Sequence, residues 1–538
     1  TDANLTRDFV FQCKKRGRQL KYADTTGQQR SGKQLLMNTL ILRRLIRPLL
    51  EDDEKYVGVM IPPTVGAATA NTALAIDKRV AVNLNYSVSA EVINACIHLT
   101  GIKHILTSRL AYMEFKKRLK LDLDDLDAEL IFLEDFRKTI TLWDKISGAL
   151  ASKLPAWLLV RKLELNTIKG DDTLTIIFTS GSTGIPKGVM LTHANITSNI
   201  DAIDQVVKLN PSDTIVGFLP FFHSFGFTVT LWSALKLNIA SVFHSSPLDS
   251  KKIGELCQQF SGTVLLATPT FLRGFLRRCD PELFATLDVV VTGAEKLPLD
   301  LAEAFDERFG TRPVEGYGAT ETSPLVSVNV PPSRASDPSM GIREGSVGRP
   351  VPGVVVKVTD LETDEELGVE ESGMLWVKGP NVMKGYYANE ETTSEVLIDG
   401  WYRSGDVAKI DKDGFIHITG RISRFSKIGG EMVPHIKIEE AINEALNASD
   451  EDGMLAAVTA VPDKKKGERL IVLHLPFDKP LDELRSELSS DHGLPNLFIP
   501  SNDSYLQVDE LPMLGTGKLD LKALQQVAKE HFASDSPT

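Results

Sequence analysis

The 538-residue sequence has few of the residues that mark several well-known classes of protein. Its four cysteines lie far apart and form no CxxC pair, so we expect neither a disulfide framework nor a zinc ribbon, and a reducing compartment fits best. The ten histidines show no HExxH spacing, which removes the usual signal of a zinc hydrolase. No apolar run approaches the ~20 residues that span a bilayer. Glycine and proline occur at ordinary levels, which excludes collagen-like and broadly disordered chains.

The charge is acidic overall but unevenly distributed. A net charge of −12 argues against a dedicated nucleic-acid-binding protein, whose footprint is strongly basic. Between Arg7 and Arg47, however, eleven basic residues stand against two acidic ones. The stretch Phe136–Leu165 is also basic and contains two tryptophans, which suits an interfacial membrane helix, an ordinary surface helix being the alternative. We therefore expect two basic surfaces that suit an acidic protein partner or lipid.

Short apolar runs alternate with helical patterns through most of the chain, which predicts an α/β fold with helix-covered sheets. The pattern of predicted elements changes at about residue 347, where short strands with Gly- and Asp-rich turns predict a small β-barrel-like subdomain over about 347–420. After Gly420 the pattern changes again and predicts a smaller, mobile α+β domain. The expected domains are thus a large one over residues 1–420 and a small one over residues 421–538.

The strongest chemical signal is a loop rich in glycine and hydroxyl groups, Thr179-Ser180-Gly181-Ser182-Thr183-Gly184-Ile185-Pro186-Lys187-Gly188. It follows an expected strand over Leu174–Phe178 and precedes an expected helix over Thr192–Val207. Glycines allow backbone N–H groups to point at phosphate, and the lysine adds positive charge. It is not a Walker A loop, because Lys187 is followed by glycine. A surface linker is the alternative, but the strand, the helix and the lysine favour a polyphosphate site.

Six further motifs follow this loop, and together they resemble the adenylate-forming superfamily of acyl-CoA synthetases, luciferases and nonribosomal-peptide adenylation domains. The resemblance covers about residues 20–530. The motifs are Phe221-Phe222-His223-Ser224-Phe225-Gly226, Gly293-Ala294-Glu295, Tyr317-Gly318-Ala319-Thr320-Glu321-Thr322, Tyr402-Arg403-Ser404-Gly405-Asp406, Gly420-Arg421 and Pro512-Met513-Leu514-Gly515-Thr516-Gly517-Lys518.

The resemblance implies an ATP site. Glu321 matches the Mg²⁺-associated glutamate, a hard carboxylate suited to a metal bridged to phosphates, and Thr320 matches the residue that contacts the α-phosphate. Tyr317 matches the aromatic residue that stacks on adenine, with core packing as the alternative. Lys187, Thr320, Glu321 and Lys518 are the expected catalytic residues. The expected ATP-binding residues are Thr179, Ser180, Gly181, Ser182, Thr183, Gly184, Ala294, Glu295, Gly316, Tyr317, Gly318, Asp406 and Arg421.

Asp406, near the end of the large domain, and residues of the small domain are expected to complete this site. Asp406 matches the aspartate that accepts hydrogen bonds from the ribose hydroxyls, a turn aspartate being the alternative, and Arg421 matches an arginine that reaches the nucleotide. Lys518 lies in a glycine-rich loop and is a flexible cation suited to stabilising charge during acyl-adenylate formation. Ser423 occupies the hinge position where the family usually has Asp or Lys, so this chain departs from the common pattern.

The remaining matches concern the acyl group and the thiol. His223 is expected to gate an acyl pocket that includes Phe222, with a buried structural histidine as the alternative. Gly429 and Gly430 correspond to the loop that lines the pantetheine tunnel. No aspartate stands within Phe218–Trp232 to meet a substrate amine, which favours a fatty acid over an amino acid.

The implied reaction has two halves. A fatty acid and Mg·ATP form an acyl-adenylate, and a phosphopantetheine thiol then takes the acyl group. Three segments, Val82–Tyr86, Ser426–Glu440 and Asp509–Pro512, resemble the acyl-ACP synthetase domain of bifunctional acyl-ACP synthetase/2-acylglycerophosphoethanolamine acyltransferases. In those proteins an acyltransferase precedes this domain, and a start at Thr1 is compatible with such a fusion.

We therefore expect acyl carrier protein as the acceptor, with coenzyme A as the alternative. Two other classes are an amino-acid-activating domain and a non-catalytic acyl- or nucleotide-binding protein. The expected location is cytoplasmic, with peripheral contact at the inner face of the membrane.

Overall fold

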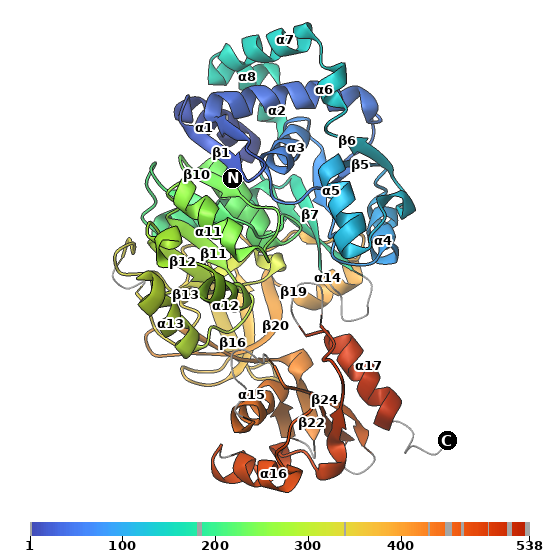
Figure 1. Cartoon of the computed structure of the whole chain (residues 1–538), viewed down its shortest axis with the longest axis vertical. Helices are drawn as coiled ribbons and strands as arrows, with labels where there is room; N and C mark the ends of the chain where they lie inside the picture. The colour runs from blue at the N-terminus through green and yellow to red at the C-terminus, as the bar shows by residue number, and fades with distance from the viewer. Residues whose placement is uncertain are drawn as a thin grey trace. The chain divides into compact units, whose positions relative to one another are not determined.

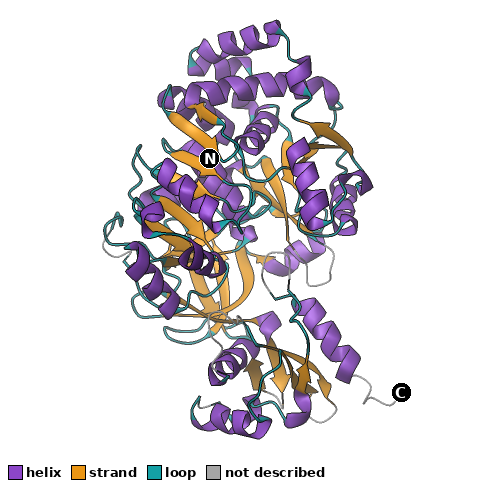
Figure 2. Ribbon diagram, viewed as in Figure 1, coloured by secondary structure: helices purple, strands orange, loops and turns teal. Residues whose placement is uncertain are grey.

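The computed structural model describes residues 3–179, 186–337, 341–428, 431–446, 454–463, 467–492, 494–513 and 519–532. The chain forms two compact units. The larger consists of Thr1–Glu371, Leu375–Ser404 and Lys409–His417, and the smaller consists of Ser372–Met374, Gly405–Ala408 and Ile418–Thr538. Helices and strands alternate in both units, so the predicted α/β fold class is confirmed (Figures 1 and 2).

The larger unit contains a nine-stranded sheet whose central strands are parallel. Strand β9 lies between β10 and β11 and pairs with both in parallel. These strands are short and almost wholly buried, as expected where helices cover both faces of a sheet. The order across the sheet is β15 (Arg349–Pro350), β14 (Leu325–Val328), β13 (Val314–Gly318), β12 (Val289–Thr292), β11 (Val264–Ala267), β9 (Thr214–Gly217), β10 (Ala240–Phe243), β1 (Leu20–Asp24) and β2 (Gln29–Ser31).

A second sheet of the larger unit has seven strands. Strand β3 pairs in parallel with β4 and β5, whereas β7 and β8 are antiparallel. Antiparallel pairing at one end of a parallel sheet is common in α/β proteins. The order is β18 (Gly385–Tyr386), β8 (Lys187–Thr192), β7 (Thr173–Thr179), β4 (Val80–Asn83), β3 (Tyr56–Met60), β5 (His104–Thr107) and β6 (Glu129–Phe132).

Helix α3 (Val65–Ile76) contacts strands of both sheets, β1 in the first and β3 and β4 in the second. Alanine and glycine make up half of this helix, and small side chains allow sheets to approach it closely. Its one asparagine, Asn71, donates to Asn83 Oδ1 at 3.1 Å, so the buried amide is satisfied. The sequence analysis did not predict α3, because a helix buried on nearly all sides lacks a one-sided apolar stripe.

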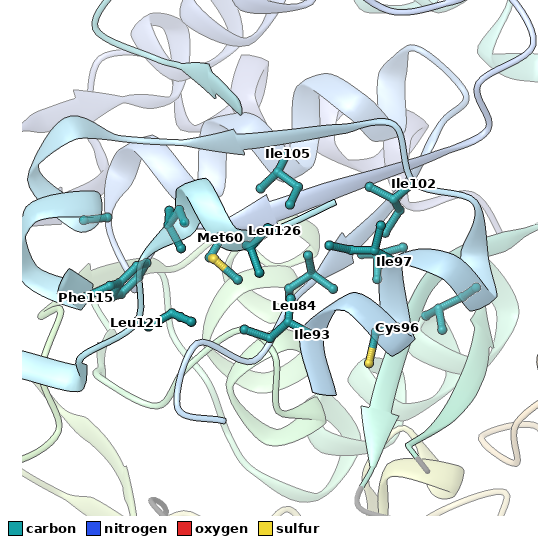
Figure 3. Close-up of a cluster of buried hydrophobic side chains, with 14 of the residues drawn as sticks. Met60, Leu84, Ile93, Cys96, Ile97, Ile102, Ile105, Phe115, Leu121 and Leu126 are labelled. Atoms are coloured by element: carbon teal, nitrogen blue, oxygen red, sulfur yellow. The ribbon is translucent and has the colours of Figure 1, made fainter. Parts of the chain in front are cut away.

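A hydrophobic cluster packs helix α4 (Ala90–Thr100) against this second sheet (Figure 3). Full burial of each large apolar side chain contributes about 1.5–3 kcal/mol relative to exposure, so the cluster is a major support of the larger unit. Its members are Met60, Val80, Val82, Leu84, Ile93, Cys96, Ile97, Ile102, Ile105, Ala111, Phe115, Leu121, Leu123, Leu126 and Ile176.

The β-rich segment that follows forms a five-stranded sheet. Its order is β16 (Val355–Thr359), β17 (Gly373–Lys378), β20 (Trp401–Ile410) and β19 (Leu397–Ile398), with β21 (Ile416–Arg421) paired to β20. The smaller unit has its own five-stranded sheet. Its strands are β23 (Glu431–Pro434), β22 (Phe425–Ile428), β25 (Gly467–His474) and β24 (Ala456–Asp463), with β26 (Tyr505–Gln507) paired to β25.

Helices of the smaller unit pack on that sheet. Helix α15 (His435–Ala445) contributes Ile438 and Ile442 to a core with β24 and with helix α16 (Leu481–Ser490). Helix α17 (Leu521–Phe532) contributes to a second core through Leu524. Among the described residues of either unit, no helix is both long enough and apolar enough to cross a membrane.

The predicted basic surface over Arg7–Arg47 is wrong in part, because much of its charge is used inside the larger unit. Lys21 on β1 is fully buried and donates to the carbonyls of Leu237, at 2.7 Å, and Ile239, at 3.1 Å. Helix α1 (Leu5–Arg16) and helix α2 (Gly32–Ile46) direct further cations to internal partners. These are Arg16 to the Pro211 and Asn238 carbonyls and Arg43 to Asp77. Arg44 and the following Arg47 also pair with Asp144 and Asp77, but their side chains are exposed.

The buried ammonium of Lys21 generates a testable pH dependence. Burial lowers the pKa of Lys21 from 10.5 to about 7. Between these values the unfolded chain binds a proton that the folded chain has released, so stability contributed by this group rises with pH. Relative to a Lys21→Met variant, the wild-type free energy of unfolding should therefore increase by about 1 kcal/mol per pH unit above pH 7.

Differential scanning calorimetry over a pH series measures this difference. The matched control is Lys15→Met, which removes an exposed lysine of helix α1 and should give a curve parallel to that of the wild type. Parallel curves for Lys21→Met and the wild type would contradict the prediction.

Candidate functional site

The predicted phosphate loop joins two antiparallel strands. Thr179 at the end of β7 lies opposite Lys187 at the start of β8, and Ser180, Gly181, Ser182, Thr183 and Gly184 lie outside the described residues. The predicted helix Thr192–Val207 corresponds to α9 (His193–Val206), but the last two residues of the predicted loop, Lys187 and Gly188, already belong to strand β8. Strand β8 intervenes because its Val189 and Leu191 are buried against the sheet, and helix α9 begins only after it.

A tight return of the chain presents two of the predicted catalytic residues. Strands β13 and β14 are antiparallel, and a short 3₁₀ turn, η7 (Thr320–Thr322), lies between them. A Cβ atom on Gly318 would lie 1.9 Å from the carbonyl oxygen of Pro324, so only glycine fits at that position. The return therefore holds Thr320 and Glu321 side by side at its tip.

Hydrogen bonds from a distant segment hold this return in place. The buried Asn381 amide donates from Nδ2 to the carbonyls of Thr322, at 2.9 Å, and Leu325, at 3.0 Å. The backbone N–H of Met383 donates to the carbonyl of Glu321 at 2.7 Å. Buried carbonyls outside regular structure need such donors, so residues 381–383 position the Glu321 backbone.

Strand β18 brings a tyrosine to the same place. Its residue Tyr386 pairs with Val189 of β8, and the Tyr386 hydroxyl donates to Glu321 Oε1 at 2.8 Å. Lys187 Nζ lies 5.2 Å from the centre of the Tyr386 ring, within the range of a cation–π interaction. Burial and the nearby Glu321 carboxylate raise the pKa of Tyr386, so its hydroxyl remains a donor.

We call Lys187, Thr320, Glu321 and Tyr386 the Glu321 cluster. Ser224 extends it, since its hydroxyl donates to Thr320 Oγ1 at 3.4 Å. The cluster combines a carboxylate, an ammonium group and hydroxyls, which suits the phosphates of a nucleotide with its Mg²⁺ ion. The sequence analysis missed Tyr386, and its only signal was an aromatic pair after a glycine, Gly385-Tyr386-Tyr387.

The number of possible ligand side chains near Glu321 indicates how Mg²⁺ would be held. No three His, Cys, Asp or Glu side chains within the described part of the chain gather into a metal site. Mg²⁺ is commonly bound by one or two carboxylates together with phosphates and water. Glu321 therefore fits an ion that the nucleotide brings with it.

The residues predicted to line adenine follow two neighbouring parallel strands, β12 and β13. Ala294 follows β12 with a φ of +71°, and Glu295 accepts a hydrogen bond from the Thr270 hydroxyl at 2.9 Å. Gly316 and Tyr317 lie on β13, and Tyr317 is half-buried. Ligands of open α/β sheets bind at the carboxyl ends of parallel strands, which is where these residues lie.

Glu315 is a positioning residue for this region that the sequence analysis missed. Its buried carboxylate accepts a hydrogen bond from the Leu297 backbone N–H at 3.0 Å, which ties the segment after β12 to β13. Burial raises the pKa of Glu315. The sequence offered no signal for it, since a glutamate within an apolar strand has no local mark of burial.

The predicted acyl-pocket residues begin a row of aromatic rings. His223 is exposed, which does not fit the alternative of a buried structural histidine, and its ring lies 4.6 Å from that of the buried Phe222. Phe222 meets Tyr86 edge to face at 4.8 Å, and Tyr86 stacks on Phe115 at 4.5 Å. Phe115 belongs to the hydrophobic cluster of Figure 3, so the row runs from the exposed His223 into apolar core.

The smaller unit pairs two of its predicted nucleotide-binding residues. Arg421 Nε donates to Asp406 Oδ1 at 2.6 Å, with the aspartate buried and the arginine side chain 57% exposed. Asp406 lies within β20, so the alternative of a turn aspartate is wrong. An ionised carboxylate has about four acceptor sites, which is the chemistry that ribose hydroxyls require.

Of the other residues predicted in the small domain, Ser423 lies within the described part of the chain. Ser423 lies in η9 (Ile422–Arg424), a 3₁₀ turn directly after β21. Gly429, Gly430 and Lys518 lie outside the described residues.

Comparisons with known proteins show what this chain is similar to. The sequence model of the family described as AMP-binding enzyme matches residues 25–387. The luciferin 4-monooxygenase of Photuris pensylvanica is 30% identical over 451 residues, which cover 81% of this chain and 78% of that protein. A long-chain-fatty-acid–CoA ligase of Bacillus subtilis is 29% identical over 439 residues, covering 79% and 73%. The ATP-bound MatB structure from Rhodopseudomonas palustris has a TM-score of 0.78 and 25% identity, covering 98% and 100%.

The Tyr386 hydroxyl generates a prediction. Tyr386→Phe keeps the ring beside Lys187 but removes the donor to Glu321, so the carboxylate loses its orienting hydrogen bond. A hydrogen bond to a charged group contributes about 1.5–3 kcal/mol, so we expect Mg·ATP to bind at least about tenfold more weakly. Isothermal titration calorimetry measures this.

The control is the neighbouring Tyr387→Phe, which removes a hydroxyl outside the Glu321 cluster and should leave Mg·ATP affinity unchanged. Wild-type affinity in Tyr386→Phe would show that the hydrogen bond does not orient Glu321 for the nucleotide.

Proposed function

Because the chain belongs to the AMP-binding enzyme family, we propose that it is a ligase that activates a medium- or long-chain fatty acid as an acyl-adenylate and transfers the acyl group to a phosphopantetheine thiol. The Glu321 cluster is the observation that carries this proposal. It unites β8, β18 and the return after β13 around groups suited to Mg·ATP. Residues 1–420 act as the adenylate-forming domain and residues 421–538 as the small domain.

In the first half-reaction, a carboxylate oxygen of the fatty acid attacks the α-phosphorus of ATP. The bond to the bridging oxygen breaks, and pyrophosphate leaves with its electron pair. Lys187 and the loop residues Thr179–Gly184 would bind the phosphates, and Thr320 would donate to the α-phosphate. Glu321 would hold Mg²⁺, whose charge would stabilise the phosphate oxygens. Lys518 supplies positive charge as the negative charge shifts in the transition state.

In the second half-reaction, a thiolate attacks the acyl carbon, and AMP leaves as the thioester forms. Asp406 accepts from the ribose hydroxyls, and Arg421, its ion-pair partner, reaches the nucleotide. Ser423 is the hinge, and Gly429 and Gly430 line the approach of the pantetheine arm. Ala294, Glu295, Gly316, Tyr317 and Gly318 hold the adenine.

The aromatic row supports a fatty acid as the substrate. It leads from the exposed His223 through Phe222 to the apolar cluster around Phe115, so a long apolar chain would meet apolar surfaces along it. The stretch Phe218–Trp232 contains no acidic residue that would bind an amine. The name of the Bacillus subtilis relative, a long-chain-fatty-acid–CoA ligase, supports the same substrate class.

Two acceptors carry the same thiol. The resemblance of Ser426–Glu440 to acyl-ACP synthetases supports acyl carrier protein, which we propose as the acceptor. The name of the Bacillus subtilis relative supports coenzyme A, the second candidate. The cations between Arg7 and Arg47 add little support for the carrier protein, since several of them face inward.

The acceptor proposal predicts the outcome of a direct assay. Purified protein with ATP, Mg²⁺ and palmitate should form acyl thioester with holo-acyl carrier protein at a higher kcat/KM than with coenzyme A. If thioester forms only with coenzyme A and not with the carrier protein, coenzyme A is the acceptor and the carrier-protein proposal is wrong. An absence of fatty-acid-dependent ATP–pyrophosphate exchange would instead indicate a non-catalytic binding protein, and exchange dependent on an amino acid would overturn the substrate class.

The role of Lys518 generates a separate prediction. Lys518→Ala removes a cation proposed to stabilise the adenylation transition state. Because loss of one such group typically lowers kcat about 10²–10³-fold, we expect a decrease of that size in the rate of adenylation. Fatty-acid-dependent ATP–pyrophosphate exchange measures this rate. Lys522→Ala, which removes an exposed lysine at the start of α17, is the matched control and should keep wild-type exchange. Full exchange by Lys518→Ala would rule out the catalytic role.

A further inference from the structure

Two consecutive helices of the larger unit expose large apolar side chains to solvent. They are α7 (Leu142–Lys153) and α8 (Ala156–Lys162), which Figure 1 shows at one end of this unit, outside α2. The exposed fractions are 74% for Leu142, 74% for Trp143, 38% for Ile146, 59% for Leu150 and 62% for Trp157. Contiguous exposed apolar side chains mark an interaction surface.

The opposite side of α7 is firmly packed, so the exposed side has a defined orientation. Gly148 lies so close to α2 that an added Cβ would be 2.4 Å from Ile41 Cγ1. Asp144 pairs with Arg44 of α2 at 2.9 Å. Leu142, Ile146 and Leu150 follow at intervals of four residues, which places them on one side of the helix.

Unpaired cations accompany these apolar side chains. Lys145 and Lys153 on α7 and Arg161 and Lys162 on α8 are exposed, and none has an ion-pair partner within the described part of the chain. The only acidic residue of the two helices, Asp144, is already paired with Arg44. This contrasts with Arg16, Lys21 and Arg43, whose charges are satisfied internally. We call the apolar and basic residues of α7 and α8 the α7–α8 face.

We propose that the α7–α8 face docks on the surface of an anionic lipid bilayer. Tryptophan and leucine side chains insert at the boundary between headgroups and acyl chains, while lysine and arginine attract anionic headgroups. Each such cation near an anionic surface strengthens binding, and here four act together on two helices whose single acidic residue, Asp144, is paired with Arg44. A second copy of the chain fits this face poorly, because a symmetric contact would place its cations against one another.

The inference goes beyond the proposed function, and it gives that function a location. A fatty acid partitions into membranes, so docking would bring the enzyme to its substrate. Vesicle binding requires neither ATP nor turnover. Failure of docking and failure of the ligase proposal are therefore distinguishable.

Vesicle flotation tests the proposal. The wild-type protein should float with vesicles of phosphatidylcholine and phosphatidylglycerol but much less with phosphatidylcholine alone, and salt should weaken the binding. Trp143→Ser with Trp157→Ser, and separately Lys153→Ala with Arg161→Ala, should each reduce partitioning about tenfold or more. Both double variants should retain wild-type ATP–pyrophosphate exchange, since Figure 1 places these helices apart from β13.

The matched control is Leu248→Ser with Lys251→Ala. It removes a leucine that is 72% exposed and an exposed lysine elsewhere on the larger unit, and it should bind vesicles as the wild type does. As a second readout, vesicles with brominated acyl chains should quench tryptophan fluorescence in the wild type and not in the Trp143→Ser, Trp157→Ser variant.

Wild-type protein that fails to float with anionic vesicles, or double variants that float as well as the wild type, would overturn the proposal. Two other results would overturn it by identifying a different occupant. One is binding of holo-acyl carrier protein that the double variants lose, and the other is a dimer in sedimentation velocity that the double variants dissociate.

Discussion

The candidate site depends on satisfying the carbonyls of the return between β13 and β14. The ladder of these strands ends at Gly318 and Leu325, so carbonyls of the return also take donors from elsewhere, and the Asn381 amide serves both Thr322 and Leu325. Asn199 of α9 donates to the same Leu325 carbonyl at 2.8 Å. Three segments far apart in sequence therefore meet at one turn, and their meeting orients Thr320 and Glu321.

Charge in this chain serves two different ends. Many cations near the N-terminus bind carbonyls or carboxylates inside the larger unit, and the fully buried Lys21 is the extreme case. The cations of α7 and α8 point to solvent beside exposed tryptophans. The net charge of −12 describes neither arrangement, because a sum over the chain carries no information on which side chains face outward.

Much of the fold was predictable from local pattern. The expected strand Leu174–Phe178 lies within β7 (Thr173–Thr179), and the expected helix Thr192–Val207 corresponds to α9 (His193–Val206), because both segments have a clear apolar pattern. The resemblance to adenylate-forming enzymes is confirmed by the family match and by relatives over most of the chain. The structure departs from the prediction where tertiary packing replaces local signals, as in the uniformly buried α3 and in β8, whose first two residues fell within the predicted loop.

The sequence by itself determined the α/β class, the order of the motifs and the membership of the family, since these depend on residue types and spacings along the chain. The tertiary structure alone decided that Tyr386 orients Glu321, that Lys21 is internal and that α7 and α8 face solvent. The reason is physical. Each of these outcomes depends on which strands pair and which surfaces are covered, and those contacts join residues that no local periodicity links.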